Sequence, residues 1–229
     1  WNFTYNGLSK LPMFQDIFRN VAIKHQYKCT YNVGSFGNNL LYESMNGHPS
    51  AYNASNNFIP EFEIANVQVS EQFSPLIGVD VTMKNSLTAS VQYKKARTLN
   101  LSFTNNQLTD NSTNEIVIGV GYRFKDVKFS VKSASGSGKI TNLKSDINVK
   151  FDFSIKDNVT VLRRIDEEVN QISAGQKMYS INFTADYMLS RNLTMAFYYN
   201  QTINRPYLSS SVDNSTLNTG ITLRFSLAQ

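Results

Sequence analysis

The chain is poor in cysteine, proline and charge. One cysteine in 229 residues excludes a disulfide within the chain, and 5 prolines with 11 glycines are too few for a low-complexity Pro/Gly chain. Charged residues make up 17%, below the usual quarter, and Asn, Ser and Thr take their place. Aromatic residues reach 12%, so the chain has enough apolar surface to order itself and disorder is disfavoured.

No apolar run approaches the roughly 18 residues that a membrane helix needs. A membrane β-strand needs only about 9–11 residues with lipid-facing side chains at alternate positions, so the mean hydropathy of -0.31 does not exclude a membrane. The net charge is +5, but Lys and Arg are scattered along the sequence, which disfavours a nucleic-acid interface.

Apolar and polar residues alternate with a period of two in several long segments. A charge on the lipid side at the bilayer midplane would cost about 2–4 kcal/mol, so mid-strand charges in one phase indicate a wet face. The predicted lumen-facing polar residues are Arg123, Lys150, Asp152, Asp186 and Arg224. The predicted lipid-facing residues, in the other phase, are Ile116, Ile118, Val120, Tyr122, Phe151, Phe153, Ile181, Phe183, Ile221 and Leu223.

Apolar and polar residues also alternate along the strands of a soluble β-sandwich. The segments here are long, and aromatic residues stand at the ends of their apolar faces, which favours a membrane barrel. We therefore predict an all-β fold: an antiparallel transmembrane β-barrel wall of about twelve or thirteen strands, with one short N-terminal helix. Residues 1–229 would be the C-terminal segment of a larger outer-membrane β-barrel, because the chain starts at Trp1 without a leader. Within it we expect a strand at 1–6, a periplasmic linker at 7–20 with a helix over Leu11–Arg19, and strands and loops over 22–228.

Connections are expected to alternate between tight turns and long loops, with the C-terminus on the short-turn side. The tight turns are predicted near Phe73–Pro75, Lys95–Arg97, Lys125–Asp126, Lys156–Asn158 and Ser190–Asn192, with Lys84–Ser86 breaking the rule. The long loops are predicted at Ser35–Pro60, Asn105–Asn114, Ala134–Asn142, Asp166–Lys177 and Gln201–Asp213. Ser133–Gly138 is predicted to be a flexible loop tip that overlaps the third of these loops.

Residues that could carry chemistry are sparse, and we predict no catalytic, cofactor-binding or metal-binding residue. His25 lies in the apolar phase and His48 in a long loop, so neither indicates a Ser-His-acid site. The carboxylates of Asp110–Glu115 and Asp166–Glu168 lack the full calcium-loop pattern. Gly119 and Gly121 are expected to relieve crowding on the inner wall or to ease strand curvature.

Six segments in order along the chain resemble the C-terminal region of the SprA/Sov family, the outer-membrane translocon of the type nine secretion system of Bacteroidetes. They are Tyr5–Lys10, Tyr31–Phe36, Glu71–Asp80, Tyr93–Arg97, Gly119–Phe124 and Ala185–Tyr187. The resemblance implies the wall of a protein-conducting channel in the bacterial outer membrane that exports folded cargo proteins, and it implies no catalytic residue. It also implies several partners: the lipid bilayer and lipopolysaccharide, upstream strands of the same polypeptide, a PorV-like outer-membrane protein, a periplasmic plug protein and the secreted cargo.

Two alternatives remain open. One is a self-contained outer-membrane pore or receptor for small solutes, since about twelve strands could close a modest barrel alone. The other is a secreted soluble β-sandwich binding module, which would need its apolar stripes to stack on a second sheet.

Overall fold

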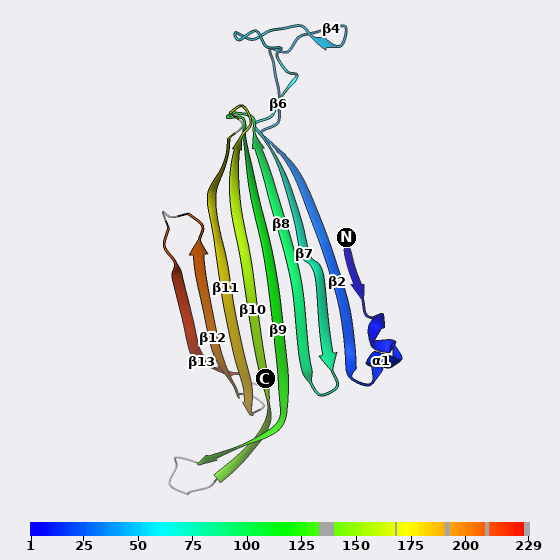
Figure 1. Cartoon of the computed structure of the whole chain (residues 1–229), viewed down its shortest axis with the longest axis vertical. Helices are drawn as coiled ribbons and strands as arrows, with labels where there is room; N and C mark the ends of the chain where they lie inside the picture. Colours follow the sequence, from blue (N-terminus) through cyan, green and yellow to red (C-terminus); the bar gives the residue numbers. More distant parts are fainter. Residues whose placement is uncertain (133–139, 168, 191–192, 209–210, 227–229) are drawn as a thin grey trace.

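Nine antiparallel strands form one continuous sheet that makes up most of the chain (Figure 1). The computed structural model describes residues 1–132, 140–167, 169–190, 193–208 and 211–226. The sheet order is β1-β2-β7-β8-β9-β10-β11-β12-β13. Its strands are β1 (Asn2–Tyr5), β2 (Phe18–Gly34), β7 (Asn66–Met83), β8 (Leu87–Ser102), β9 (Gln107–Lys132), β10 (Ile140–Arg164), β11 (Val169–Ser190), β12 (Leu193–Pro206) and β13 (Asn214–Phe225). In the described part of the chain β1 and β13 do not pair with each other, so the sheet has two edges.

The predicted all-β, antiparallel fold is confirmed, but the predicted count of twelve or thirteen membrane strands is wrong. The strands are fewer and longer: β9 has 26 residues and β10 has 25. Lys95–Arg97, Lys125–Asp126 and Lys156–Asn158, predicted as turns, lie inside β8, β9 and β10. Lys95–Arg97 and Lys156–Asn158 remain extended because each neighbouring strand supplies backbone hydrogen-bond partners, which local sequence does not reveal. Lys125–Asp126 is an irregularity within β9, where the pairing with β10 is interrupted and Asp126 has a φ of 59°.

The predicted alternation of short and long connections is also wrong. Phe73–Pro75 lies within β7, at a register shift against β8. Most of Asn105–Asn114 and Asp166–Lys177 is strand, and Gln201–Asp213 begins as strand through Pro206. The turn at Lys84–Ser86 lies at the same end of the sheet as the end of β13. We call that end the lower end, as in Figure 1. Ser190–Asn192 does join β11 to β12, whereas the Ser133–Gly138 tip lies outside the described residues.

One connection is long, as expected near Ser35–Pro60, and it extends beyond the upper end of the sheet (Figure 1). It joins β2 to β7 and contains four two-residue strands in two small pairs. These strands are β3 (Gly37–Asn38) with β6 (Phe62–Glu63), and β4 (Ser44–Met45) with β5 (His48–Pro49).

The N-terminal stretch begins with strand β1, as predicted. A 3-10 turn, η1 (Gly7–Lys10), and a single-turn helix, α1 (Pro12–Gln15), follow it. The helix is shorter than the predicted Leu11–Arg19, because Phe18 already pairs with Met83 of β7. Sheet pairing therefore overrides the helical spacing of the apolar residues.

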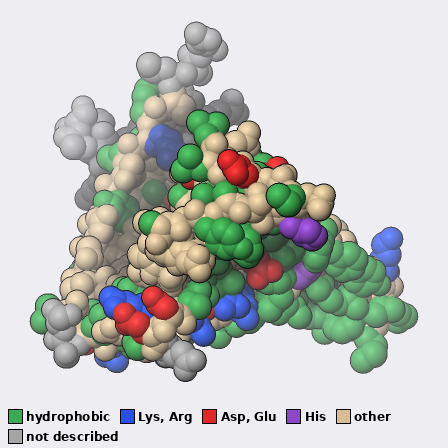
Figure 2. Space-filling view, turned by 90° about the horizontal axis from the view of Figure 1, so that it is seen from above, with side chains coloured by type: hydrophobic (Ala, Val, Ile, Leu, Met, Phe, Trp, Pro, Cys, Tyr) green, Lys and Arg blue, Asp and Glu red, His purple; other side chains and the backbone are tan. Residues whose placement is uncertain are grey.

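The sheet is a single layer with almost no interior. Only Val21, Ala22 and Tyr187 are buried hydrophobic residues among those described. The accessible surface is 16245 Å², whereas a folded monomer of this mass exposes roughly 10,500 Å². Seen along the strands, a contiguous group of hydrophobic side chains lies at the surface of the molecule (Figure 2). Much of the apolar surface of the sheet is therefore exposed in the described structure.

Candidate functional site

All ten predicted lipid-facing residues share one face of the sheet, which we call the outer face. Residues paired across antiparallel strands lie on the same face, and the register aligns the apolar positions of successive strands. Two such rows are Ile118–Phe153–Ile181 and Val120–Phe151–Phe183. Ile221 pairs with Phe197 and Leu223 with Met195, which extends the face to β13.

The apolar part of the outer face has a defined height, and we call it the apolar belt. Ile116–Phe124 of β9 pairs in register with Ile147–Ile155 of β10, which pairs in turn with Tyr179–Tyr187 of β11. With a rise of about 3.3 Å per residue, these segments measure roughly 26 Å along the strands. Ile116, Ile118 and Val120 are 46%, 42% and 42% exposed, so no second sheet covers them in the described structure.

The five predicted lumen-facing residues all lie on the opposite, inner face. Arg123 pairs with Asn148, which pairs with Asp186. Lys150 pairs with Thr184, Asp152 with Asn182, and Arg224 with Thr194. Outside these charges the inner face is dominated by hydroxyl and amide side chains, for example Thr202, Asn200, Asn218 and Thr216 on β12 and β13.

Most charges on the inner face are neutralised by a neighbour on the same wall. The Nζ atom of Lys150 lies 3.2 Å from Asp152 Oδ2. Three further pairs are Lys24–Asp80 at 2.6 Å, Lys94–Glu115 at 3.8 Å and Arg123–Asp146, whose Nε donates to Oδ2 at 2.8 Å. The middle of the inner wall is therefore polar but close to neutral.

Gly119 makes room for side chains on this crowded face, as predicted for the inner wall. A Cβ atom at Gly119 would lie 2.6 Å from both Asp152 Oδ1 and Ser90 Oγ. At Gly121 it would lie 2.6 Å from Thr88 Oγ1. Both glycines thus accommodate polar side chains of the adjoining strands.

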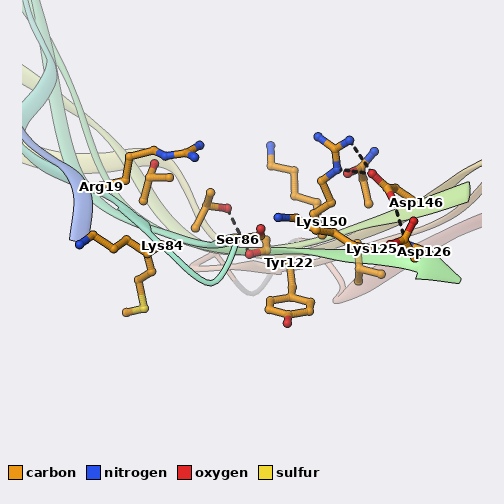
Figure 3. Close-up of a pocket in the computed structure, with 15 residues that line it drawn as sticks. Arg19, Lys84, Ser86, Tyr122, Lys125, Asp126, Asp146 and Lys150 are labelled. Atoms are coloured by element: carbon orange, nitrogen blue, oxygen red, sulfur yellow. Dashed lines mark hydrogen bonds and ion pairs between the residues drawn. The ribbon is translucent and has the colours of Figure 1, made fainter. Parts of the chain in front are cut away.

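A hollow of ≈ 730 Å³ lies at the lower end of the inner face (Figure 3). We call it the lower hollow. The charged residues that line it are Arg19, Lys84, Arg123, Lys125, Lys150, Asp126 and Asp146. Tyr122 also lines it, although its ring points to the opposite side from the Arg19 side chain (Figure 3). Five cations therefore face two carboxylates.

Both carboxylates of the lower hollow are engaged in structure. Asp146 accepts the Arg123 guanidinium and, through Oδ1, the backbone N–H of Asp126 at 2.9 Å. Asp126 lies 3.0 Å from Lys144 Nζ and adopts a left-handed φ of 59°. These contacts coincide with the register shift where β9 and β10 bend away from the sheet (Figure 1).

A second polar cluster lies on the outer face above the apolar belt. Arg97 donates through Nε and Nη2 to the two oxygens of Asp110, at 3.0 and 2.8 Å, and Arg163 reaches the same carboxylate at 3.3 Å. The Arg97 hydrogen bonds hold the pKa of Asp110 below its ordinary value. Asp110 lies on β9 and not in the predicted loop. The period-two alternation that includes Ile116 extends back to Asp110 and assigns it to the same face.

The two histidines lie in different parts of the structure, His25 on β2 and His48 on β5. The ring Nδ1 of His25 lies 2.6 Å from the backbone oxygen of Leu76, so the side chain contacts protein, and His48 is exposed on β5. Residues Asp110–Glu115 lie on β9 and not in a loop. Within the described ranges no group of three or more His, Cys, Asp or Glu side chains could hold a metal ion.

No protein-family model matches this chain, and no curated protein matches it. Among the described residues no helix is long and apolar enough to cross a membrane.

Proposed function

We propose that this chain is part of the wall of a large channel in the bacterial outer membrane that exports folded proteins. The supporting observation is the exposed apolar belt, which covers one face of a one-layer sheet whose other face is polar. A belt of nine-residue segments matches the roughly 9–11 residues of a strand that crosses a bilayer. Lipid would cover the outer face and water the inner face.

The two free edges favour a larger barrel over a small closed pore. β1 has four residues and leaves most of β2 without a neighbour on that side, and β13 is the other edge. In hydrocarbon, each unpaired backbone group costs several kcal/mol, so additional strands must complete the wall. Upstream strands of the same polypeptide are the proposed source.

The chemistry of the inner face supports passage of proteins better than capture of a solute. Several of its charges form ion pairs within the wall, and its other side chains are mainly hydroxyls and amides. Such a surface offers a passing folded protein neither an apolar patch nor a strong field to bind to. The proposed partners on either side of the wall are lipid with lipopolysaccharide, a PorV-like protein, a periplasmic plug protein and the cargo itself.

Site-specific cysteine labelling tests the assignment of the two faces. In a Cys29→Ser background, Ile118→Cys and Lys150→Cys are introduced one at a time into the native full-length polypeptide in outer membranes. A membrane-impermeant maleimide is expected to label position 150 and to spare position 118 until detergent is added. Equal labelling of both positions before detergent would contradict a lipid-covered outer face.

The isolated residues 1–229 test the larger-barrel assignment. We expect this piece to aggregate in detergent, because its sheet edges have no partners. A stable monomer with heat-modifiable gel mobility and a reproducible small conductance would instead support the self-contained pore. Solubility without detergent would favour the sandwich, although the described residues contain no second sheet to cover the belt.

A further inference from the structure

The lower hollow differs electrostatically from the rest of the inner wall. Higher on that wall, Lys24, Lys94 and Lys150 each have a carboxylate within ion-pair distance. In the described part of the chain, Arg19, Lys84 and Lys125 have none. Lys28 and Lys156, higher on the inner face, also have no described carboxylate within ion-pair distance, but they lie on different strands, β2 and β10. The lower hollow differs in that three unpaired cations line one cavity.

The cations of the lower hollow are spread over several strands. Arg19 lies on β2, Lys84 in the β7–β8 turn, Lys125 on β9 and Lys150 on β10. β2 and β10 are separated by four strand spacings of about 4.8 Å, which amounts to roughly 19 Å. One phosphate group cannot bridge that distance, whereas several carboxylates along an extended polypeptide can.

The two carboxylates of the lower hollow already have partners. Asp146 binds both the Arg123 guanidinium and the backbone of Asp126, and Asp126 lies 3.0 Å from Lys144, so neither carboxylate lies within ion-pair distance of Arg19, Lys84 or Lys125. Salt weakens such exposed charges but does not cancel them within about 8–10 Å. An incoming anionic chain would therefore meet three cations without a close carboxylate partner.

We propose that the lower hollow binds carboxylate-rich polypeptide segments at the entrance of the inner wall. This inference rests on the proposed function, because only a wall with a wet inner face presents the hollow to other proteins. The hollow would raise the local concentration of an acidic segment, and the neutral wall above it would let the segment move on.

The test uses a fluorescent deca-glutamate peptide and the native full-length polypeptide in detergent micelles, at low ionic strength, read by fluorescence anisotropy. The variant combines Arg19→Gln, Lys84→Gln and Lys125→Gln. The matched control combines Lys28→Gln, Lys95→Gln and Lys177→Gln, which removes the same charge away from the hollow. From about 0.2–1 kcal/mol per exposed charge pair, the variant is expected to bind roughly tenfold more weakly and the control to bind nearly as the native protein does.

Three outcomes would overturn the inference. The first is that the variant binds the peptide as tightly as the native protein does, and the second is that the control variant loses as much affinity as the variant. The third is that inorganic phosphate, at the same concentration of negative charge, displaces the peptide. The last outcome would show a small-anion site. Heat-modifiable gel mobility is read on the same samples, and the labelling pattern at positions 118 and 150 is read in outer membranes before detergent extraction. If these are normal and peptide binding is absent, the inference alone fails; if they are abnormal, the proposed function fails.

Discussion

The two faces of the sheet have the same backbone and different side chains, one face apolar and the other polar. On the outer face, Phe151 is the cross-strand neighbour of Phe183 and is 41% exposed. On the inner face, Gly119 is the cross-strand neighbour of Asp152, and its lack of a side chain leaves room for that carboxylate. Successive cross-strand pairs point alternately to the two faces of the sheet and have the same backbone pairing. The two faces therefore differ only in the types of side chain that they carry. A substitution should therefore have very different effects on adjacent residues.

The largest expected effect is a charge placed in the apolar belt. Ile118→Lys should destabilise the membrane-inserted protein by about 2–4 kcal/mol, because the ammonium would lie near the bilayer midplane. Urea unfolding of the full-length polypeptide in lipid vesicles measures this cost. The matched variant is Val117→Lys, one residue away on the inner face, where the cost should stay below about 1 kcal/mol. Equal costs for the two lysines would remove the distinction between the faces.

Next in size is overcrowding of the inner face. Gly119→Val should cost about 1–3 kcal/mol, because the new side chain would collide with Asp152 and Ser90. Adding Asp152→Ala should recover part of the loss, since it removes one of the two obstructing side chains. Unfolding in vesicles gives the coupling energy of the double-mutant cycle. Strictly additive costs would show that Gly119 is needed for backbone reasons and not for space.

The polar cluster above the belt should contribute a comparable or smaller amount. Asp110→Asn should cost about 1–3 kcal/mol, because Asp110 is 9% exposed and accepts three charged hydrogen bonds. Asp213→Asn is the control: its oxygen lies 3.8 Å from Arg205 and both side chains are more than 60% exposed, so the loss should be below about 0.5 kcal/mol.

The lowered pKa of Asp110 also gives a pH dependence. The ionised carboxylate contributes its stability above its unfolded pKa of about 4, and that stability is lost as the pH falls through the lower, folded-state pKa. Unfolding measured between about pH 5 and pH 2 should therefore show a steeper loss for the native protein than for Asp110→Asn. Parallel curves would contradict the ion-pair explanation.

The smallest effect is expected at the bend of β9. Asp126 has a φ of 59°, which glycine adopts without strain. Asp126→Gly should therefore be neutral or stabilising by up to about 1 kcal/mol, despite losing its exposed contact with Lys144. Asp126→Ala, which loses the same contact and retains the strain, should be less stable than the glycine variant. The reverse order would show that the Asp126 side chain matters more than its backbone.

The sequence pattern located the faces well and the strand ends poorly. Alternation is a local property, so the phase of Lys150 and Phe151 could be read directly from their neighbours. Lys95–Arg97 and Lys156–Asn158 resemble turns in isolation, yet they continue their strands beyond the apolar belt. The lower hollow was not predicted at all, because Arg19, Lys84 and Lys125 are far apart in sequence and no local pattern links them.

The amino-acid sequence by itself determined that the strands have one apolar and one polar side, because successive side chains in an extended chain point in opposite directions. Only the tertiary structure decided how many strands there are, how far they extend and which charges meet. Backbone hydrogen bonds from a neighbouring strand can keep a polar stretch extended, and side-chain pairing depends on a register between segments that are distant along the chain.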